Sequence, residues 1–254
     1  MLKKKPSSVA ARIAEFWFAI FMKPDLIRLY YSSSKKSRYS LRDVKSTGIL
    51  FLHIPKCAGV SVNNSLYGSL GAGHTTLNNA LIGLGPFEYT NVFKFTIVRN
   101  PWDRLVSAYF FLEKGGFGER DKNFFNENLS NYRDFDDFVL NWVTKKNVML
   151  WNHFIPQSIF LSISDTKVDL DFLCFFESLE EDFQCIYDAK RWESFKTLSD
   201  TNGSDHKNYR QYYTDASKKV VEEVYADDIE FFGYDFDGKK RELQKVWRAQ
   251  EFPI

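Results

Sequence analysis

Three short apolar runs, each followed by a turn and then a helical pattern, constrain the fold of this chain more than any other feature. The runs cover residues 48–54, 92–98 and 170–176. A continuous apolar run of this length is typical of a strand buried on both faces, as in parallel sheets covered by helices. The repeated order of strand, turn and helix therefore predicts an α/β fold: one P-loop-like parallel sheet flanked by helices, in a single domain.

The bulk composition narrows the possible classes of protein. The chain has 254 residues, of which 44% are hydrophobic and 17% aromatic, enough for a large core. Its formal net charge is only +1, so no overall basic field would attract nucleic acid, and any anion must be held by local groups. Cys57, Cys174 and Cys185 form no CxxC pair and lie at no metal-ligand spacing from a histidine. We therefore expect no disulfide scaffold, no bound metal and a reducing cytoplasm.

Two terminal segments, residues 1–47 and 237–254, lie outside the part of the sequence that contains the expected strands. Residues 1–47 are expected to form an N-terminal helix and a solvated connector, because apolar residues recur at helical spacing between Ala10 and Met22. That run is shorter than the ~20 apolar residues that span a bilayer. It predicts either a helix packed on the domain or a helix resting in peripheral contact with a membrane. The domain is expected over residues 48–236, and residues 237–254 are expected to form a helical tail.

The glycine- and asparagine-rich stretch from Gly115 to Tyr132 is polar. It predicts a long surface loop over the site.

The turn after the first strand runs from His53 to Ser61. A strand that ends in a turn of small residues and opens a helix can cradle an anion, because backbone N–H groups and the helix dipole point at it. Lys56 adds a positive charge, and the small residues Ala58 and Gly59 let the backbone approach a ligand closely. The sequence lacks the GxxxxGK[ST] string, and no pair of acidic residues stands beside the turn to hold magnesium. The alternative is an ordinary strand-to-helix turn with a surface lysine.

The turn after the second strand begins at Arg99, at the carboxyl end where open α/β sheets bind ligands. Asn100 and Pro101 suit the N-cap and the first position of a helix. Arginine can grip a phosphate with two hydrogen bonds, and Ser107, two helical turns further on, can complete the grip. Arg104 is expected to point elsewhere, into an ion pair or a contact at the edge of the core.

At these two turns the chain resembles sulfotransferases that use 3′-phosphoadenosine 5′-phosphosulfate (PAPS). The sequence HIPKCAG from His53 is similar to their 5′-phosphosulfate loop, and FTIVRNPWDRLVSAY from Phe95 is similar to their 3′-phosphate element. The likeness is closer to carbohydrate sulfotransferases, from the Golgi and from bacteria, than to aryl sulfotransferases. It covers roughly residues 48–236. Three further segments agree with it, at residues 153–157, 172–183 and 209–234.

The resemblance implies a role for each matched residue. Those expected to enclose the 5′-phosphosulfate are Lys56, Cys57, Ala58, Gly59, Val60 and Ser61. Arg99 and Ser107 would hold the 3′-phosphate. Arg210 and His206 flank a polar turn and are expected to reach the phosphate or the adenine. Val60 departs from the family, which usually has Thr or Ser there, so one hydroxyl contact is missing.

The implied reaction is an in-line transfer of a sulfuryl group from PAPS to a hydroxyl of a carbohydrate or glycolipid acceptor. It needs a base, for which the candidates are His53, His74, His153 and a carboxylate. His74 is preferred, because it lies in a flexible loop between the two phosphate elements, where related glycan sulfotransferases carry a catalytic histidine. His53 fits better as a buried histidine bonded to backbone, and His153 could orient the acceptor or pack beside Trp151. Lys56 would stabilise the leaving group.

Two other functions remain open from the sequence. A P-loop nucleotide phosphotransferase would need magnesium and a GK[ST] string that is missing here. A non-catalytic relative that binds PAPS without turnover is suggested only by Val60. A Golgi enzyme of this kind would carry a membrane anchor, so the sequence favours a bacterial cytoplasmic protein.

Overall fold

The computed structural model describes residues 41–164, 167–190 and 207–239. Its central sheet has three parallel strands in the order β1-β2-β5, every residue of which is buried. The strands are β1 (Ile49–Leu52), β2 (Phe93–Val98) and β5 (Phe172–Phe175). The predicted parallel sheet is confirmed. Strands β1 and β5 are shorter than the apolar runs that predicted them, because the ends of those runs already belong to the connecting turns.

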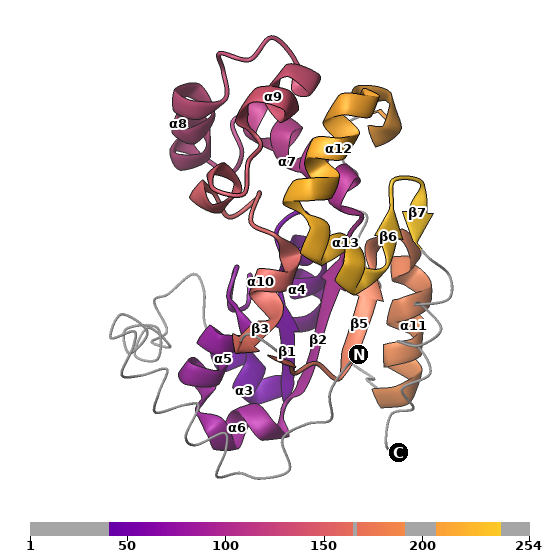
Figure 1. The fold of residues 1–254 in the computed structure, drawn as a ribbon. Coiled ribbons are helices and arrows are strands. Elements are labelled where there is room, and N and C mark those ends of the chain that lie inside the picture. Colours follow the sequence, from indigo (N-terminus) through magenta and orange to yellow (C-terminus); the bar gives the residue numbers. More distant parts are fainter. Residues whose placement is uncertain (1–40, 165–166, 191–206, 240–254) are drawn as a thin grey trace.

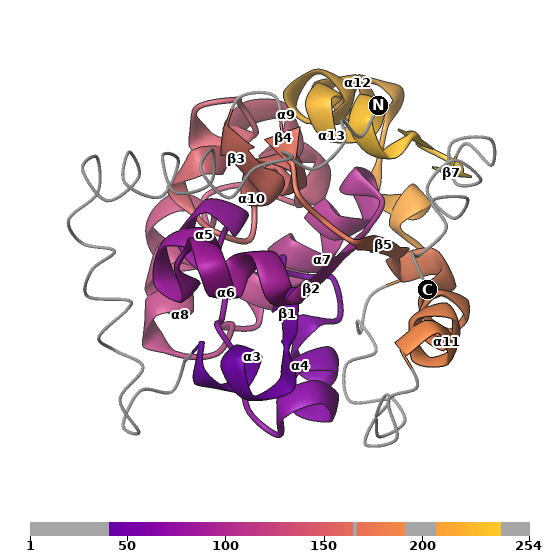
Figure 2. The same cartoon turned by 90° about the horizontal axis from the view of Figure 1, so that it is seen from below.

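Helices cover both faces of this sheet (Figures 1 and 2). On one face lie α4 (Gly59–Tyr67) and α11 (Leu179–Lys190). On the other face lie α5 (Leu77–Leu84), α10 (Gln157–Leu161) and α13 (Ala226–Phe232). The remaining elements that border the sheet or join these helices are α3 (Arg42–Thr47), α6 (Pro86–Asn91), β3 (Ser162–Ser164), β4 (Lys167–Val168), η2 (Phe176–Ser178), β6 (Tyr234–Asp235) and β7 (Gly238–Lys239).

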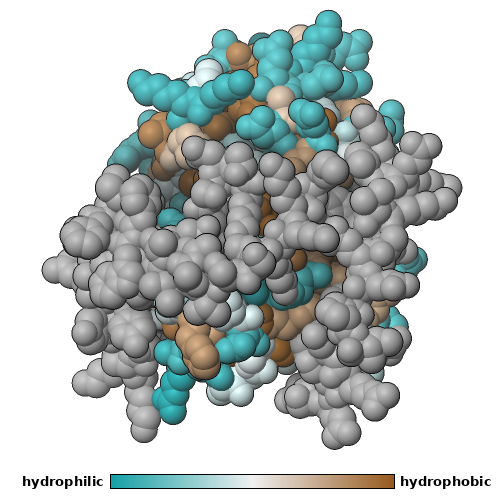
Figure 3. All heavy atoms as spheres, turned by 60° about the horizontal axis from the view of Figure 1, so that its bottom comes forward, coloured by the Kyte–Doolittle hydropathy of each residue, from teal (hydrophilic) through white to brown (hydrophobic). Residues whose placement is uncertain are grey.

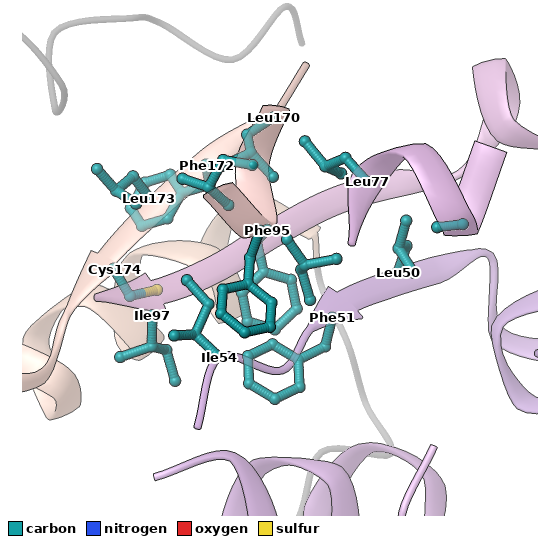
Figure 4. Close-up of a cluster of buried hydrophobic side chains, with 14 of the residues drawn as sticks. Leu50, Phe51, Ile54, Leu77, Phe95, Ile97, Leu170, Phe172, Leu173 and Cys174 are labelled. Carbon is teal, nitrogen blue, oxygen red and sulfur yellow. The ribbon is translucent and has the colours of Figure 1, made fainter. Parts of the chain in front are cut away.

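The apolar core of the sheet is built from side chains of all three strands (Figure 4). Phe51 of β1 and Phe95 of β2 pack with their ring centroids 5.0 Å apart, and both are almost completely buried. Burying one such side chain contributes about 1.5–3 kcal/mol. This core fixes the carboxyl ends of β1 and β2 next to each other, where the two predicted binding turns begin.

A second core, rich in aromatic residues, lies among α7 (Pro101–Glu113), α8 (Glu119–Asn128), α9 (Phe135–Trp142) and α12 (Asp215–Val224). Phe138 is central to it, with ring centroids 4.8 Å from Tyr109 and 5.4 Å from Trp142. The atoms at the top of Figure 3 are mostly hydrophilic, with hydrophobic ones beneath them. This core holds α7, which starts at the end of β2 (Figure 1). The short helices η1 (Asn147–Leu150) and η3 (Tyr209–Tyr212) complete this part.

Two local predictions were wrong. The stretch from Gly115 to Tyr132 is no long loop, because helix α8 occupies its middle. Phe124 on that helix is buried and stacks on Trp151 with centroids 4.3 Å apart, so contacts with a distant segment stabilise a helix whose own composition is polar. Likewise, the end of the predicted solvated connector forms α3, which buries Val44 completely.

The predicted N-terminal helix lies outside the described residues, as does most of the predicted C-terminal tail. The part of that tail that the structure describes contains strand β7, which pairs with β6. Among the described helices, none combines the length and the apolar character needed to cross a bilayer.

Candidate functional site

The turn between β1 and α4 takes a shape that exposes backbone amides. Lys56 and Ala58 both have left-handed backbone angles, with φ of 68° and 57°. Such alternation turns neighbouring N–H groups toward one concave side, which suits an anion. The first amides of α4 also have no carbonyl partner within their own helix. The local backbone therefore forms the kind of cradle that the sequence predicted.

Gly59 is required at this turn by the packing beneath it. A Cβ atom at this position would lie 1.7 Å from Cδ2 of His53, far inside van der Waals contact. His53 is buried, and its Nδ1 accepts a hydrogen bond from Nδ2 of Asn63 at 3.2 Å. Burial, followed by the neighbouring His74, lowers the pKa of His53 well below its usual value. His53 thus supports the turn as a neutral ring, and its side-chain partner is Asn63 rather than the backbone partner that we expected.

The cation of the first turn lies against an aromatic ring. Nζ of Lys56 is 3.8 Å from the ring centroid of Phe111 on α7. Burial, together with the nearby Arg99 guanidinium, lowers the pKa of Lys56 to about 8. At neutral pH the side chain therefore remains mostly charged, but it deprotonates within an accessible range.

The second turn places Arg99 in direct contact with the first. Its guanidinium is buried, and Nε donates to Oδ2 of Asp103 at 2.8 Å. Nη1 donates to the carbonyl oxygen of Lys56 at 3.1 Å. The guanidinium carbon also lies 4.1 Å from the ring centroid of Phe176. The structure therefore brings Lys56 and Arg99 to one place, with the arginine held by three different partners.

Asn100 begins helix α7 as its predicted N-cap. Its side-chain oxygen accepts the amides of Trp102 and Asp103 at 3.0 and 3.4 Å, and its Nδ2 donates to the carbonyl of Asp235 at 2.9 Å. Ser107 lies buried on the same helix, two turns further along. Ser107 thus lies on a well-capped helix, and Arg99 directly precedes the cap.

His74 lies between α4 and α5, as the sequence requires, and close to the first turn. Its ring centroid is 4.3 Å from that of His53, and its Nδ1 is 3.3 Å from the carbonyl oxygen of His53. A carbonyl can only accept, so this bond places the proton on Nδ1 and leaves Nε2 of the neutral ring free of a proton. Part of the His74 side chain is exposed to solvent. Its pKa is nevertheless lowered, first by desolvation and then by the positive charges of Arg104 and Lys56. The bond to the His53 carbonyl acts in the opposite direction and raises the pKa.

The profile of the sulfotransferase family matches residues 40–235, a span that contains both turns and all three candidate histidines. The chain belongs to the sulfotransferase family. The family and the fold inferred from the sequence are thereby confirmed, and the family's chemistry makes the protein a transferase of sulfuryl groups. No curated protein and no solved structure matches the chain.

The sulfotransferase chain brings a third histidine to the same place. The ring centroid of His153 is 5.9 Å from that of His74 and 5.0 Å from that of Phe111. His153 is buried, and burial, followed by the neighbouring His74, lowers its pKa well below the usual value. Its Nδ1 has no hydrogen-bond partner among the described residues. The three histidines therefore lie in contact one after another, and His153 and Lys56 both contact Phe111.

Arg210 is engaged elsewhere in this sulfotransferase. Its Nη2 donates to the carbonyl of Asp237 at 2.5 Å, and its guanidinium lies 4.7 Å from the ring centroid of Tyr209. These contacts tie it to the hairpin of β6 and β7. A role for Arg210 in nucleotide binding stays a prediction, and His206 lies outside the described residues.

Arg104 makes a buried contact, one of the two roles expected for it, but this contact lies at the first turn rather than elsewhere. Its side chain is almost fully buried, and Nε donates to the carbonyl of Pro55 at 3.0 Å. Its Nη2 has no hydrogen-bond partner among the residues that the structure describes. A guanidinium keeps its charge when buried, so Arg104 adds a fixed positive charge beneath Lys56.

Two further features complete the site of this sulfotransferase. Cys57 is buried with its thiol against Pro55 and Gln157, and burial raises its pKa to about 12, so it is no thiolate at neutral pH. In the described part of the chain, no group of three or more His, Cys, Asp or Glu residues is arranged to hold a metal ion. Sequence reasoning gave Arg104, Phe111 and Gln157 no part in the site. Arg104 lies within the motif that begins at Phe95, and Gln157 ends the segment of residues 153–157 that agrees with the family resemblance.

Proposed function

We propose that this sulfotransferase moves the sulfuryl group of PAPS to a hydroxyl of a carbohydrate-like acceptor. The observation that carries the proposal is the direct hydrogen bond between the two turns, from Nη1 of Arg99 to the carbonyl of Lys56. A nucleotide with phosphates at both its 5′ and 3′ positions needs two anion sites a short distance apart. A P-loop phosphotransferase needs one polyphosphate cradle with a GK[ST] string, which this chain lacks.

The residues of the two turns fit the two ends of PAPS. The backbone between Lys56 and Ser61 would hold the 5′-phosphosulfate through amides, with the Lys56 ammonium beside it. Arg99, just before α7, and Ser107, on α7, would hold the 3′-phosphate. Val60 cannot donate a hydroxyl, but the amide donors of the turn do not depend on the side chain at that position. The proposed donor site therefore tolerates this departure from the family.

His74 is the proposed base, because the bond to the His53 carbonyl leaves Nε2 of its neutral ring able to accept a proton. The acceptor hydroxyl gives its proton to Nε2 as its oxygen forms the new bond to sulfur. The bond between sulfur and the bridging 5′-phosphate oxygen breaks in the same step, and 3′,5′-ADP leaves with the electron pair. Lys56 stabilises the negative charge that develops on this oxygen.

The proposed acceptor is a carbohydrate or a glycolipid rather than a nucleic acid. The resemblance to carbohydrate sulfotransferases supports a sugar hydroxyl. Phe111, half-buried beside Lys56, supplies an aromatic ring that a sugar can stack on. A peripheral contact of the N-terminal segment with a membrane would bring a glycolipid within reach. That contact is part of the proposal and rests on the sequence alone.

The experiment combines ligand binding with transfer. Calorimetry should detect binding of 3′,5′-ADP in the absence of metal. The rise in melting temperature with 3′,5′-ADP should exceed the rise with Mg-ATP. We expect Lys56→Ala and Arg99→Ala to abolish transfer from PAPS across a panel of sugar acceptors, whereas Lys146→Ala, an exposed lysine, keeps it. His74→Ala should lose turnover but retain 3′,5′-ADP binding. Wild-type turnover in His74→Ala would remove it as the base, and a preference for Mg-ATP would overturn the proposal.

One observation favours a second candidate. Val60, half-buried in the first turn of α4, replaces the usual hydroxyl of the family. A protein that binds 3′,5′-ADP tightly yet transfers sulfate to no acceptor on the panel would be a non-catalytic PAPS-binding relative.

A further inference from the structure

Gln157, at the start of α10, contacts both turns through one side-chain amide. Its Oε1 accepts the backbone N–H of Arg99 at 2.9 Å and the thiol of Cys57 at 3.4 Å. Its Nε2 donates to the carbonyl of Arg99, also at 2.9 Å. The side chain is fully buried, so water does not compete for these bonds. One amide group thus joins a residue that follows β1 to a residue that follows β2.

The position of Gln157 is itself held from the opposite side. Asp228 of α13 accepts the backbone amide of Gln157 at 2.7 Å through Oδ2 and that of Ser158 at 2.8 Å through Oδ1. The carbonyl of Phe154, just before this segment, accepts the hydroxyl of Tyr225 at 2.7 Å. Both Asp228 and Tyr225 are buried. The amide of Gln157 therefore rests on a fixed support rather than on a mobile side chain.

The sheet alone does not set the distance between the two turns. The last paired residues of β1 and β2 are Leu52 and Thr96. Cys57 and Arg99 lie beyond that pair, where no strand-to-strand ladder between β1 and β2 continues. Gln157 takes the place of a neighbouring strand there, because it satisfies both the N–H and the C=O of Arg99. Its bond with Cys57 extends the same connection to the other turn.

We propose that Gln157 is a positioning residue that fixes the separation of the two phosphate-binding turns. The inference rests on the proposed PAPS site, since it concerns how the two ends of that nucleotide are bound together. Two anion sites bind one ligand more tightly than either alone only when their spacing matches the ligand, and the gain disappears when it does not. Gln157 is therefore expected to control this gain rather than the strength of either site.

The test measures the gain in affinity from the second phosphate by calorimetry with adenosine 5′-phosphate, adenosine 3′-phosphate and 3′,5′-ADP. In the wild-type protein we expect the second phosphate to tighten binding by at least roughly tenfold over the better monophosphate. Gln157→Met has a similar size but makes none of the side-chain bonds. It should lose most of that gain and change the binding of each monophosphate less than about threefold. Gln157→Asn keeps an amide with a shorter reach, so it should lose the same gain if Gln157→Met does not fold.

The matched control is Phe160→Leu, a buried change one turn further along α10 that leaves these bonds in place. It should lower the melting temperature and preserve the gain. A variant of Gln157 that folds and keeps the wild-type gain overturns the positioning role while the proposed function stands. A wild-type protein that binds none of the three nucleotides overturns the proposed function and the positioning role together.

Discussion

The two turns at the carboxyl ends of β1 and β2 would bind the proposed nucleotide through different parts of the chain. The first would use its backbone: two left-handed residues, Lys56 and Ala58, and the first amides of α4, which have no carbonyl partner within their own helix. The second would use side chains: the Arg99 guanidinium held by Asp103, and the Asn100 side chain that caps α7. Each turn should therefore tolerate a different kind of change. The first turn should not tolerate added side-chain volume, and the second should not tolerate altered side-chain chemistry.

The largest expected effect is at Gly59, where one added methyl group should destroy the first turn. In Gly59→Ala the new Cβ would overlap the His53 ring. We expect a loss of unfolding free energy of about 3 kcal/mol, at the upper end for overpacking, together with loss of 3′,5′-ADP binding. Denaturant unfolding and calorimetry measure the two effects. The double variant His53→Ala/Gly59→Ala should recover part of the stability, and wild-type behaviour of Gly59→Ala would contradict the packing argument.

A conservative change in the second turn should have the next largest effect. Arg99→Lys keeps the charge but cannot make both the bond to Asp103 and the bond to the Lys56 carbonyl. Charge-assisted bonds of this kind are each worth about 1.5–3 kcal/mol, so we expect 3′,5′-ADP binding to weaken by about 2 kcal/mol. Lys56→Arg, which leaves the backbone amides in place, should weaken this binding less. Equal losses in the two variants would erase the proposed difference between the turns.

The pH dependence of kcat/KM should report two groups: His74, the proposed base, and Lys56, the proposed cation beside the leaving group. His74 must be neutral to accept a proton, and its pKa is lowered, so the rate should rise with pH below 6.5, the ordinary pKa of histidine. Lys56 must be charged, and its pKa of about 8 predicts a fall at higher pH. Each limb should approach a tenfold change per pH unit. Initial rates from pH 5 to 9.5 measure the profile, and in Lys56→Arg the upper limb should vanish, because the guanidinium stays charged. An upper limb that persists in this variant would assign it to another group.

The smallest effects should have opposite signs in the two turns. Ala58 has a left-handed backbone that glycine adopts more easily, so Ala58→Gly should raise the unfolding free energy by up to about 1 kcal/mol and keep 3′,5′-ADP binding. Asn100→Ala removes the cap of α7 and should lower the unfolding free energy by about 1 kcal/mol. Denaturant unfolding of both variants measures the difference. If both variants are destabilised, side chains matter in the first turn as well.

Local patterns predicted the sheet and both turns because their signals are carried by neighbouring residues. A buried strand, a turn of small residues and a capped helix each lie within a few positions of sequence, as in the segment from Phe95 to Ser107. The same principle explains the wrong prediction for residues 115–132. Helix α8 depends on Trp151, a residue more than twenty positions away, which the local composition does not reveal.

The sequence by itself determined the parallel α/β sheet, the sulfotransferase family and which two turns meet at one edge of the sheet. Each of these depends on residues that are neighbours in the sequence. Only the tertiary structure decided what holds those turns together. The thiol of Cys57 meets Gln157 across 100 residues of sequence, Arg104 turns under Pro55, and His53 fills the space that makes Gly59 necessary. Such contacts depend on how distant side chains share one buried volume, and no pattern along the chain specifies that.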